Sequence, residues 1–350
     1  MKKFRILDFA FSIKEAANKK ILFITLSAML FALCSAAQAQ QQPRNTPTIG
    51  YLSRDTGPDS IDEAFMEGLR ALGWIESQNI VIEYRRAAYK MDRLRGLAED
   101  LVRLKVDLIV TATQQVTMAA KQATGTIPIV MRYSSDAVDA GLIASLARPG
   151  GNVTGLSEQY PDVNTKLLEV LHETLPNVKE VAFLWDPDSS VYTKTYRAAQ
   201  AVAPALRLSL QSLELRHKNI TSKKMTEDIE SRLRAVSRER AGALVIVSRL
   251  YGQFGRRIAE FSAKNRVPVF SVSTSAVEKY SGLLAYAPDW SDMSRRAATY
   301  VDKILKGRKP ADLPVEQPRK FKLVISLKTA EQIGLTIPPN VLARADRVIK

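Results

Sequence analysis

The sequence predicts an α/β protein with two lobes, each a parallel sheet with helices on both faces. From Pro47 onward, short β-branched runs alternate with amphipathic stretches of helical length, and repeated strand–helix units of this kind form parallel sheets with right-handed crossovers. Residues 148–155, which include a proline and three glycines, interrupt the alternation. A similar series follows, so this segment is interpreted as a crossing or hinge between two lobes.

The first series contains four strands and four helices. Its first helix is the clearest, because Ile61, Phe65, Leu69 and Leu72 recur at helical spacing. The predicted strands are 48–52, 80–84, 107–111 and 127–133, and the predicted helices are 61–72, 92–104, 115–124 and 137–146.

The second series repeats the architecture without obvious repetition of sequence. Its predicted helices are 162–174, 192–206, 226–240 and 254–265, and its predicted strands are 180–185, 208–215, 243–247, 268–272 and 283–286. A helix over 290–305, a proline-punctuated stretch over 307–318, a strand over 322–326 and a helical tail complete the chain.

The N-terminus predicts secretion. A basic start, an apolar run over residues 21–34 and the small-residue sequence 37–39 (AQA) are typical of a cleavable signal, and the apolar run is too short to span a bilayer comfortably. The charged start is long and contains acidic residues, so the alternative is that the segment stays attached as a membrane anchor. Leu33 precedes Cys34, whereas a lipid-acceptor cysteine normally follows a small residue. We expect a signal peptide over 1–39 and a soluble periplasmic protein.

Composition excludes several classes of protein. Residues 40–350 carry 45 basic and 34 acidic residues, a net charge of about +11, but the basic residues are scattered among acids, which favours a solvated surface over nucleic-acid binding. The single cysteine lies in the predicted signal. Neither disulfides nor thiolate metal sites can therefore stabilise the mature chain, which depends on an ordinary core.

Signs of catalysis are scarce. His172 and His217 lack metal-ligand spacing, and the chain contains no G-x-S-x-G, Walker A or G-x-G-x-x-G motif. Asp136 and Asp139 could form a glycosidase-like pair, but their close spacing at a helix start fits capping better. We expect neither a cofactor nor an enzyme.

Polar residues recur directly after the predicted strands of both series. In open parallel sheets, ligands bind outside the carboxyl ends of the strands, where helix N-termini offer free N–H groups. The alternative for any single residue is ordinary helix capping. Taken together, the set favours a cleft between two lobes.

Four segments carry a resemblance to a known family: residues 140–155 (AGLIASLARPGGNVTG), 304–315 (ILKGRKPADLPV), 329–338 (TAEQIGLTIP) and 342–346 (LARAD). With them, the chain resembles ABC transporter substrate-binding proteins of the group that includes tryptophan- and aromatic-amino-acid-binding members. The resemblance covers almost the whole mature chain.

The resemblance implies a type I periplasmic binding fold, with two flavodoxin-like lobes joined by three crossings. It places residues 40–155 and about 285–310 in the first lobe, and residues 156–284 and about 318–350 in the second. It also implies delivery of a small-molecule ligand to an inner-membrane permease with a cytoplasmic ATPase, and we expect the protein to be a monomer. In amino-acid binders of this fold, groups after the third and fourth strands hold the ligand carboxylate.

The candidate ligand-binding residues lie at strand ends or in the loops that follow. They are Ser53, Arg54, Thr113, Gln114, Tyr133, Ser135, Asp136, Asp186, Ser190, Ser248, Arg249, Ser273 and Tyr286.

Arginines at strand ends suggest an anionic ligand. Related sequences often carry an acid after the strand equivalent to 243–247, suited to an ammonium group, whereas this chain has Ser248-Arg249. Arg54 and Arg132 also lie at strand ends, and arginine pairs with carboxylate in a bidentate fork. The hypothesis is an aromatic or other organic acid, or an amino acid; the alternative is that all three arginines point into solvent.

Two other functions remain open at this point. A ligand-presenting sensory protein has the same sequence features as a transport component. A secreted α/β hydrolase using cleft carboxylates is disfavoured by the missing nucleophile motif and the scarcity of histidine.

Overall fold

The computed structural model describes residues 46–350 except 159, 217–221 and 248–250, so the predicted signal peptide lies outside the described residues. The first sheet is entirely parallel, in the order β2-β1-β3-β4-β5. Its strands are β1 (Thr48–Ser53), β2 (Val81–Arg86), β3 (Leu108–Thr111), β4 (Ile129–Met131) and β5 (Val153–Gly155). The carboxyl ends of β1, β3 and β4 are therefore neighbours along one edge, called here the first carboxyl edge.

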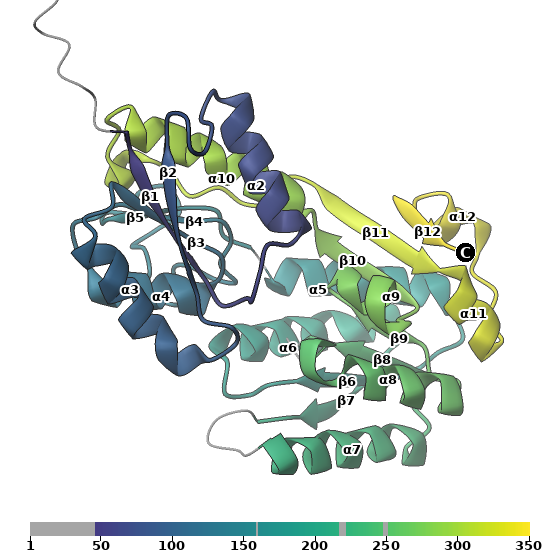
Figure 1. Ribbon diagram of the computed structural model, residues 1–350. Coiled ribbons are helices and arrows are strands. Elements are labelled where there is room, and N and C mark those ends of the chain that lie inside the picture. The colour runs from purple at the N-terminus through teal and green to yellow at the C-terminus, as the bar shows by residue number, and fades with distance from the viewer. Residues whose placement is uncertain (1–45, 159, 217–221, 248–250) are drawn as a thin grey trace, which may run out of the picture. The chain divides into compact units, whose positions relative to one another are not determined.

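Helices cover both faces of this sheet (Figure 1). A short 3-10 turn (Met91–Arg93), α3 (Leu94–Arg103) and α4 (Gln114–Ala123) lie on one face, where they bury Leu101 and Val116. On the other face lie α2 (Ser60–Ala71) and α10 (Trp290–Leu305), with Phe65 and Val301 in a common core.

The close approach of α2 and α10 depends on Gly68. A Cβ at this position would lie 2.7 Å from the carbonyl oxygen of Arg295, so a side chain would separate the two helices.

The second sheet has seven strands in the order β12-β11-β10-β9-β8-β6-β7. They are β6 (Glu180–Trp185), β7 (Ser209–Glu214), β8 (Ala243–Ile246), β9 (Val269–Ser271), β10 (Leu284–Pro288), β11 (Phe321–Ser326) and β12 (Arg347–Ile349). All its pairings are parallel except that of β10 with β11. The predicted fold class is confirmed, with one antiparallel pair that the strand–helix alternation did not indicate.

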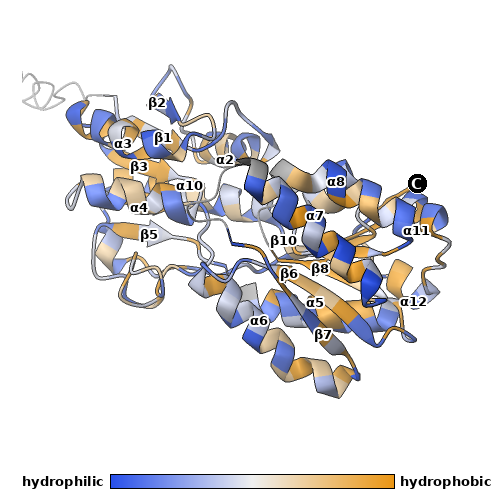
Figure 2. Ribbon diagram, turned by 90° about the horizontal axis from the view of Figure 1, so that it is seen from below, coloured by the Kyte–Doolittle hydropathy of each residue, from blue (hydrophilic) through white to orange (hydrophobic). Residues whose placement is uncertain are grey.

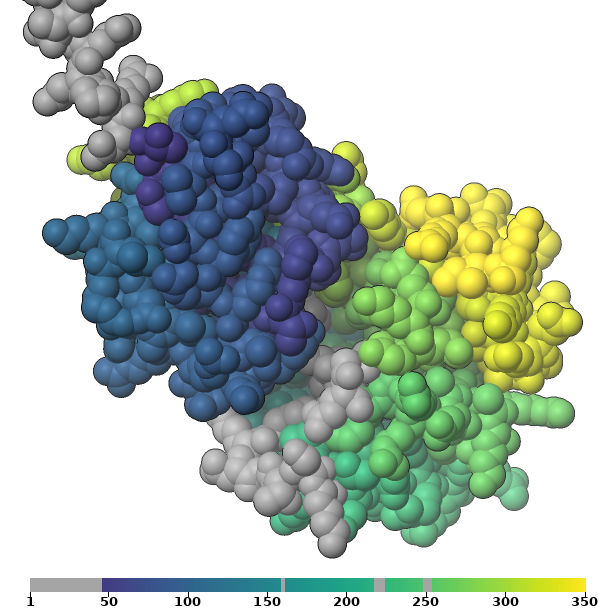
Figure 3. Space-filling model, in the orientation of Figure 1, coloured from purple at the N-terminus to yellow at the C-terminus, as the bar shows by residue number. Residues whose placement is uncertain are grey.

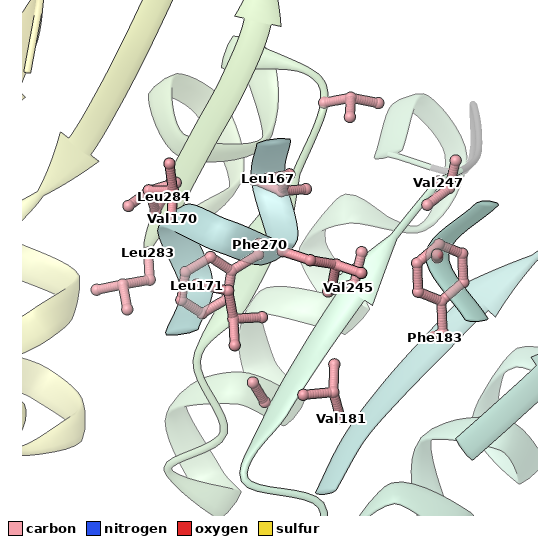
Figure 4. Close-up of a cluster of buried hydrophobic side chains, with 14 of the residues drawn as sticks. Leu167, Val170, Leu171, Val181, Phe183, Val245, Val247, Phe270, Leu283 and Leu284 are labelled. Atoms are coloured by element: carbon pink, nitrogen blue, oxygen red, sulfur yellow. The ribbon is translucent and has the colours of Figure 1, made fainter. Parts of the chain in front are cut away.

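Two apolar clusters flank this sheet. One contains α5 (Tyr160–Thr174), α6 (Ser190–Val202) with its 3-10 continuation (Ala203–Leu206), α11 (Leu327–Ile333) and α12 (Pro339–Leu342); the other contains α7 (Ser222–Arg238), α8 (Tyr251–Asn265) and α9 (Thr274–Tyr280). In the first cluster, Leu167 and Leu171 of α5 lie beside Phe270 of β9 (Figure 4). The strands are mostly hydrophobic and the helices carry hydrophilic outer faces (Figure 2), as expected for a sheet buried on both sides.

The helix predicted over 137–146 is wrong. Residues 137–141 form turns, and Gly141 has a φ of +65°, a left-handed conformation that ends helical geometry. Helix α9 was not predicted because it is short. The predicted helical tail contains α11 and α12 but ends in strand β12, which is also too short to be marked by a local pattern. The C-terminal residues from α11 to β12 form a continuous patch of surface, coloured yellow in Figure 3.

The chain passes from one sheet to the other three times: after β5, between β10 and α10, and between a 3-10 turn (Pro310–Asp312) and β11. The segment 148–155 itself ends in β5, an edge strand, and the first crossing follows it. Leu156 forms a parallel bridge with Glu316, which also pairs with Arg296 of α10. The first and third crossings are thus held together where they leave the first sheet.

Candidate functional site

Buried polar atoms without hydrogen-bond partners gather at the first carboxyl edge. They are Oγ1 of Thr113 and Oε1 of Gln114 after β3, and Oγ of Ser134 after β4. Nε of Arg54 after β1 also makes no hydrogen bond, but it lies 3.5 Å from Oδ1 of Asp55. Ser134 is fully buried and Thr113 is 6% exposed. Because buried polar groups in proteins nearly always have partners, these atoms are candidates for contact with a bound molecule.

The alternative role of helix capping does not account for Thr113. This residue occupies the N-cap position of α4 with extended backbone, yet its hydroxyl makes no capping hydrogen bond. Beside it, the free N–H groups of the first turn of α4 add donors and a partial positive charge. The end of β3 can therefore hold an anionic group such as a carboxylate.

Tyr133 and Trp290 form an aromatic pair beside this edge. Their ring centroids are 6.1 Å apart and their planes differ by 16°, and Nε1 of Trp290 is buried without a hydrogen-bond partner. Trp290 begins α10, about 160 residues from β4 in sequence, so reading strand ends alone missed it. A partly exposed stacked pair with a free indole N–H can contact a flat ligand.

Burial raises the pKa of Tyr133 to about 12, although the guanidiniums of Arg132 and Arg54 act in the opposite direction. An unfolded tyrosine ionises near pH 10, so between about pH 10 and 12 the folded state holds a proton that the unfolded state has lost. The free energy of unfolding is therefore expected to fall as pH rises through this range. Urea unfolding of the Tyr133→Phe variant should show a shallower fall; an equal slope in both proteins would contradict the assignment.

Ser135 and Asp136 lie in an open pocket of about 270 Å3. Ser157 and Glu158, from the first crossing, also line it. Asp136 is 3.5 Å from Nζ of Lys194, which also pairs with Asp139 at 2.6 Å, and Oδ1 of Asp136 accepts from the N–H of Asp139 as a capping residue would. Glu158 is 4% exposed and was not among the predicted residues, because no strand-end pattern marks it.

The other predicted residues do not all join this group. Ser53 is buried and donates to Asp55. In the second lobe, Asp186 follows β6, exposed Ser190 begins α6, and Ser273 precedes α9 without a capping bond. Tyr286 stacks on Phe321 in a different pocket, of about 250 Å3. Ser248 and Arg249 lie outside the described residues.

Arg132 does not point into solvent. Its side chain is 2% exposed and its NH2 group lies 2.8 Å from Oδ1 of Asp62 in α2, while NH1 donates to Oγ of Ser294 at 3.0 Å. Asp62 also accepts from the Tyr51 hydroxyl at 2.5 Å and faces Arg86 at 3.2 Å. The solvent-facing alternative is therefore wrong for Arg132, which belongs to a buried ionic network that sequence spacing did not reveal.

The described residues contain neither a membrane-spanning helix nor a cluster of metal-binding side chains. Within residues 46–350, apart from the three short segments that the structure does not describe, no helix combines the length and apolar character needed to cross a membrane. The same residues contain no group of three His, Cys, Asp or Glu side chains that could hold a metal ion.

Comparison with known proteins gives consistent matches. The model of the family described as ABC transporter substrate binding protein matches residues 51–349. A Tyrosine-binding protein of Clostridioides difficile is 26% identical over 334 residues, covering 91% of this chain and 93% of its own length.

Two crystal structures have the same fold, each with a TM-score of 0.77 over 87% of this chain and all of the other. A conserved domain protein from Vibrio cholerae is 27% identical. An ABC domain from Streptococcus pneumoniae, in complex with L-Trp, is 25% identical.

Proposed function

Since the chain belongs to the family of ABC transporter substrate-binding proteins, we propose that it is the extracytoplasmic solute-binding component of an ABC import system. The residues expected to form a signal peptide, 1–39, would direct it to the periplasm. Its partners would be a small-molecule ligand and an inner-membrane permease with a cytoplasmic ATPase.

The proposed ligand is a small organic molecule with a carboxylate, either an aromatic or other acid or an amino acid. The observation that carries this proposal is the pair of buried hydroxyls without hydrogen-bond partners at the first carboxyl edge, of Thr113 and Ser134, with Arg54 and Gln114 beside them. Arginine, hydroxyl and helix N-terminal donors suit a carboxylate. The aromatic pair of Tyr133 and Trp290 suits a flat side chain.

Two relatives support an aromatic ligand. One is named a Tyrosine-binding protein and the other was crystallised in complex with L-Trp. Whether this chain requires an ammonium group on its ligand depends on which charges face it, and Arg249 is the residue that would disfavour one.

In the proposed mechanism, the ligand first binds one lobe and then bridges both. Closure about the three crossings excludes water, and the permease recognises the closed form. Hinge closure is an established motion of periplasmic binding proteins, and a ligand that contacts both lobes shifts the population toward the closed state. No bond is made or broken.

Binding is tested with L-tyrosine, L-tryptophan, indole-3-propionate and tryptamine, by calorimetry and thermal unfolding. Thr113→Val is expected to weaken binding of the carboxylate-bearing compounds roughly 10- to 100-fold, the effect of losing a hydrogen bond to a charged group. Thr299→Val, which removes a hydroxyl on α10 that bonds to Arg296, is the matched control. Unchanged affinity of Thr113→Val for every compound that binds would reject the proposed site.

The same panel decides the role of Arg249. If this residue holds a carboxylate or excludes an ammonium, Arg249→Ala should weaken indole-3-propionate relative to the amino acids. Equal affinity of the variant and the wild type for every compound would remove Arg249 from the site.

A further inference from the structure

The buried network beneath the first carboxyl edge carries more positive than negative charge. It contains two guanidiniums, of Arg86 and Arg132, and one carboxylate, of Asp62. Asp62 is 5% exposed, and both of its oxygens are engaged by the arginines and by Tyr51. One positive charge is therefore left without a buried partner inside the network.

Two other acids, after β1 and at the start of α2, do not remove that charge within the network, and buried Glu158 acts on Tyr133 from the first crossing, outside the network. Asp55 pairs with Arg54, at 3.5 Å between Oδ1 and Nε, and Asp59 is a solvent-exposed cap of α2. Nε of Arg132 is also buried without a hydrogen-bond partner. A fully satisfied structural ion pair would show neither an excess charge nor a free donor.

The network lies directly against the candidate site. Arg132 immediately precedes Tyr133 and Ser134, and its guanidinium carbon lies 6.0 Å from the centroid of the Tyr133 ring and 5.2 Å from that of Tyr51. In a partly buried environment, a unit charge acts on its neighbours far more strongly than it does in water.

We propose that the Arg86–Asp62–Arg132 network makes the site selective for an anionic ligand group, a carboxylate, by placing an uncompensated positive charge beneath it. The three residues are positioning residues, because they act through the field at Tyr133 and Ser134 and not by contact with the ligand. This inference rests on the proposed function and names residues that set its charge preference.

Substitutions of opposite charge test the proposal. Asp62→Asn adds a net positive charge to the network, and Arg86→Gln removes one. Calorimetric titration with indole-3-propionate, an anion, is expected to show binding on the order of tenfold tighter for Asp62→Asn and tenfold weaker for Arg86→Gln, the effect of one charge acting through partly buried protein. Tryptamine, a cation, should not gain affinity in Asp62→Asn.

The pair of Glu67 and Arg295, 3.2 Å apart and about half exposed on the same helices, supplies matched controls. Glu67→Gln and Arg295→Gln change the charge equally but at the surface, and should alter affinity less than twofold because solvent screens them. Circular dichroism shows which variants fold.

Tighter binding by Asp62→Asn together with weaker binding by Arg86→Gln supports an electrostatic effect of the network, because structural damage would weaken binding in both variants. Weaker or unchanged binding in both variants, with wild-type binding intact, overturns this inference alone. If Asp62→Asn does not fold, the affinity of Arg86→Gln for indole-3-propionate is compared with that of the surface control Arg295→Gln. Equal affinities of these two variants overturn the inference. Absence of binding by the wild type to every compound of the panel removes the proposed carboxylate site and the inference with it.

Discussion

Arg132→Met is expected to lower the free energy of unfolding by about 3 kcal/mol, the lower end of the range for breaking a buried ion pair. The substitution leaves the carboxylate of Asp62, 5% exposed, without its closest guanidinium. Arg86 still faces Asp62 at 3.2 Å, which is why we expect the lower end of the range. Chemical denaturation monitored by circular dichroism gives the value.

A double-mutant cycle separates the ion pair from loss of packing. Arg132→Met should cost less in an Asp62→Leu background than in the wild type, because the carboxylate that pairs with Arg132 is then absent. Arg295→Met, which breaks the exposed pair with Glu67, should cost less than about 1 kcal/mol. If Arg132→Met cost no more than Arg295→Met, the network would not stabilise the fold.

Gly155→Ala is expected to destabilise the protein by roughly 4 kcal/mol, combining backbone strain with forced displacement of a strand. Gly155 ends β5 with a φ of +129°, and a Cβ there would lie 2.1 Å from the carbonyl oxygen of Met131 in β4. The same oxygen accepts a hydrogen bond from the N–H of Leu156. Neither strand can move away without losing the pairing that leads into the first crossing.

Gly151→Ala is the matched control for this prediction. Gly151 lies four residues earlier, and a Cβ there meets no atom within 4 Å, so the substitution should change stability by less than about 0.5 kcal/mol. Thermal unfolding of both variants provides the comparison. Similar transitions for Gly155→Ala and the wild type would show that β4 and β5 adapt more freely than their hydrogen bonds suggest.

Local sequence predicted most of the elements. Strand 180–185 and helix 290–305 were predicted with their observed bounds, because apolar periodicity is strong in both. The helix over 137–146 failed where Gly141 takes a left-handed conformation. The antiparallel pairing of β10 with β11 depends on how the chain returns from the third crossing, which no local pattern encodes.

The candidate site was partly predictable. Polar residues after strands drew attention to Thr113, Gln114 and the segment after β4, and these do lie at one edge of the sheet, because parallel strands bring their carboxyl ends together. Trp290 and Glu158 reach the same region from α10 and the first crossing. Tyr286, although at a predicted strand end, stacks on Phe321 in a different pocket.

The sequence by itself determined the fold class. Strands and amphipathic helices are marked by patterns among neighbouring residues, and their alternation along the chain indicates an α/β fold. The sequence also indicated at which strand ends polar side chains would lie close together. Only the tertiary structure decided which polar atoms lack partners and which charges are buried together, as at Asp62 and Arg132. The physical reason is that burial and pairing depend on residues distant in the chain, which folding alone brings within contact distance.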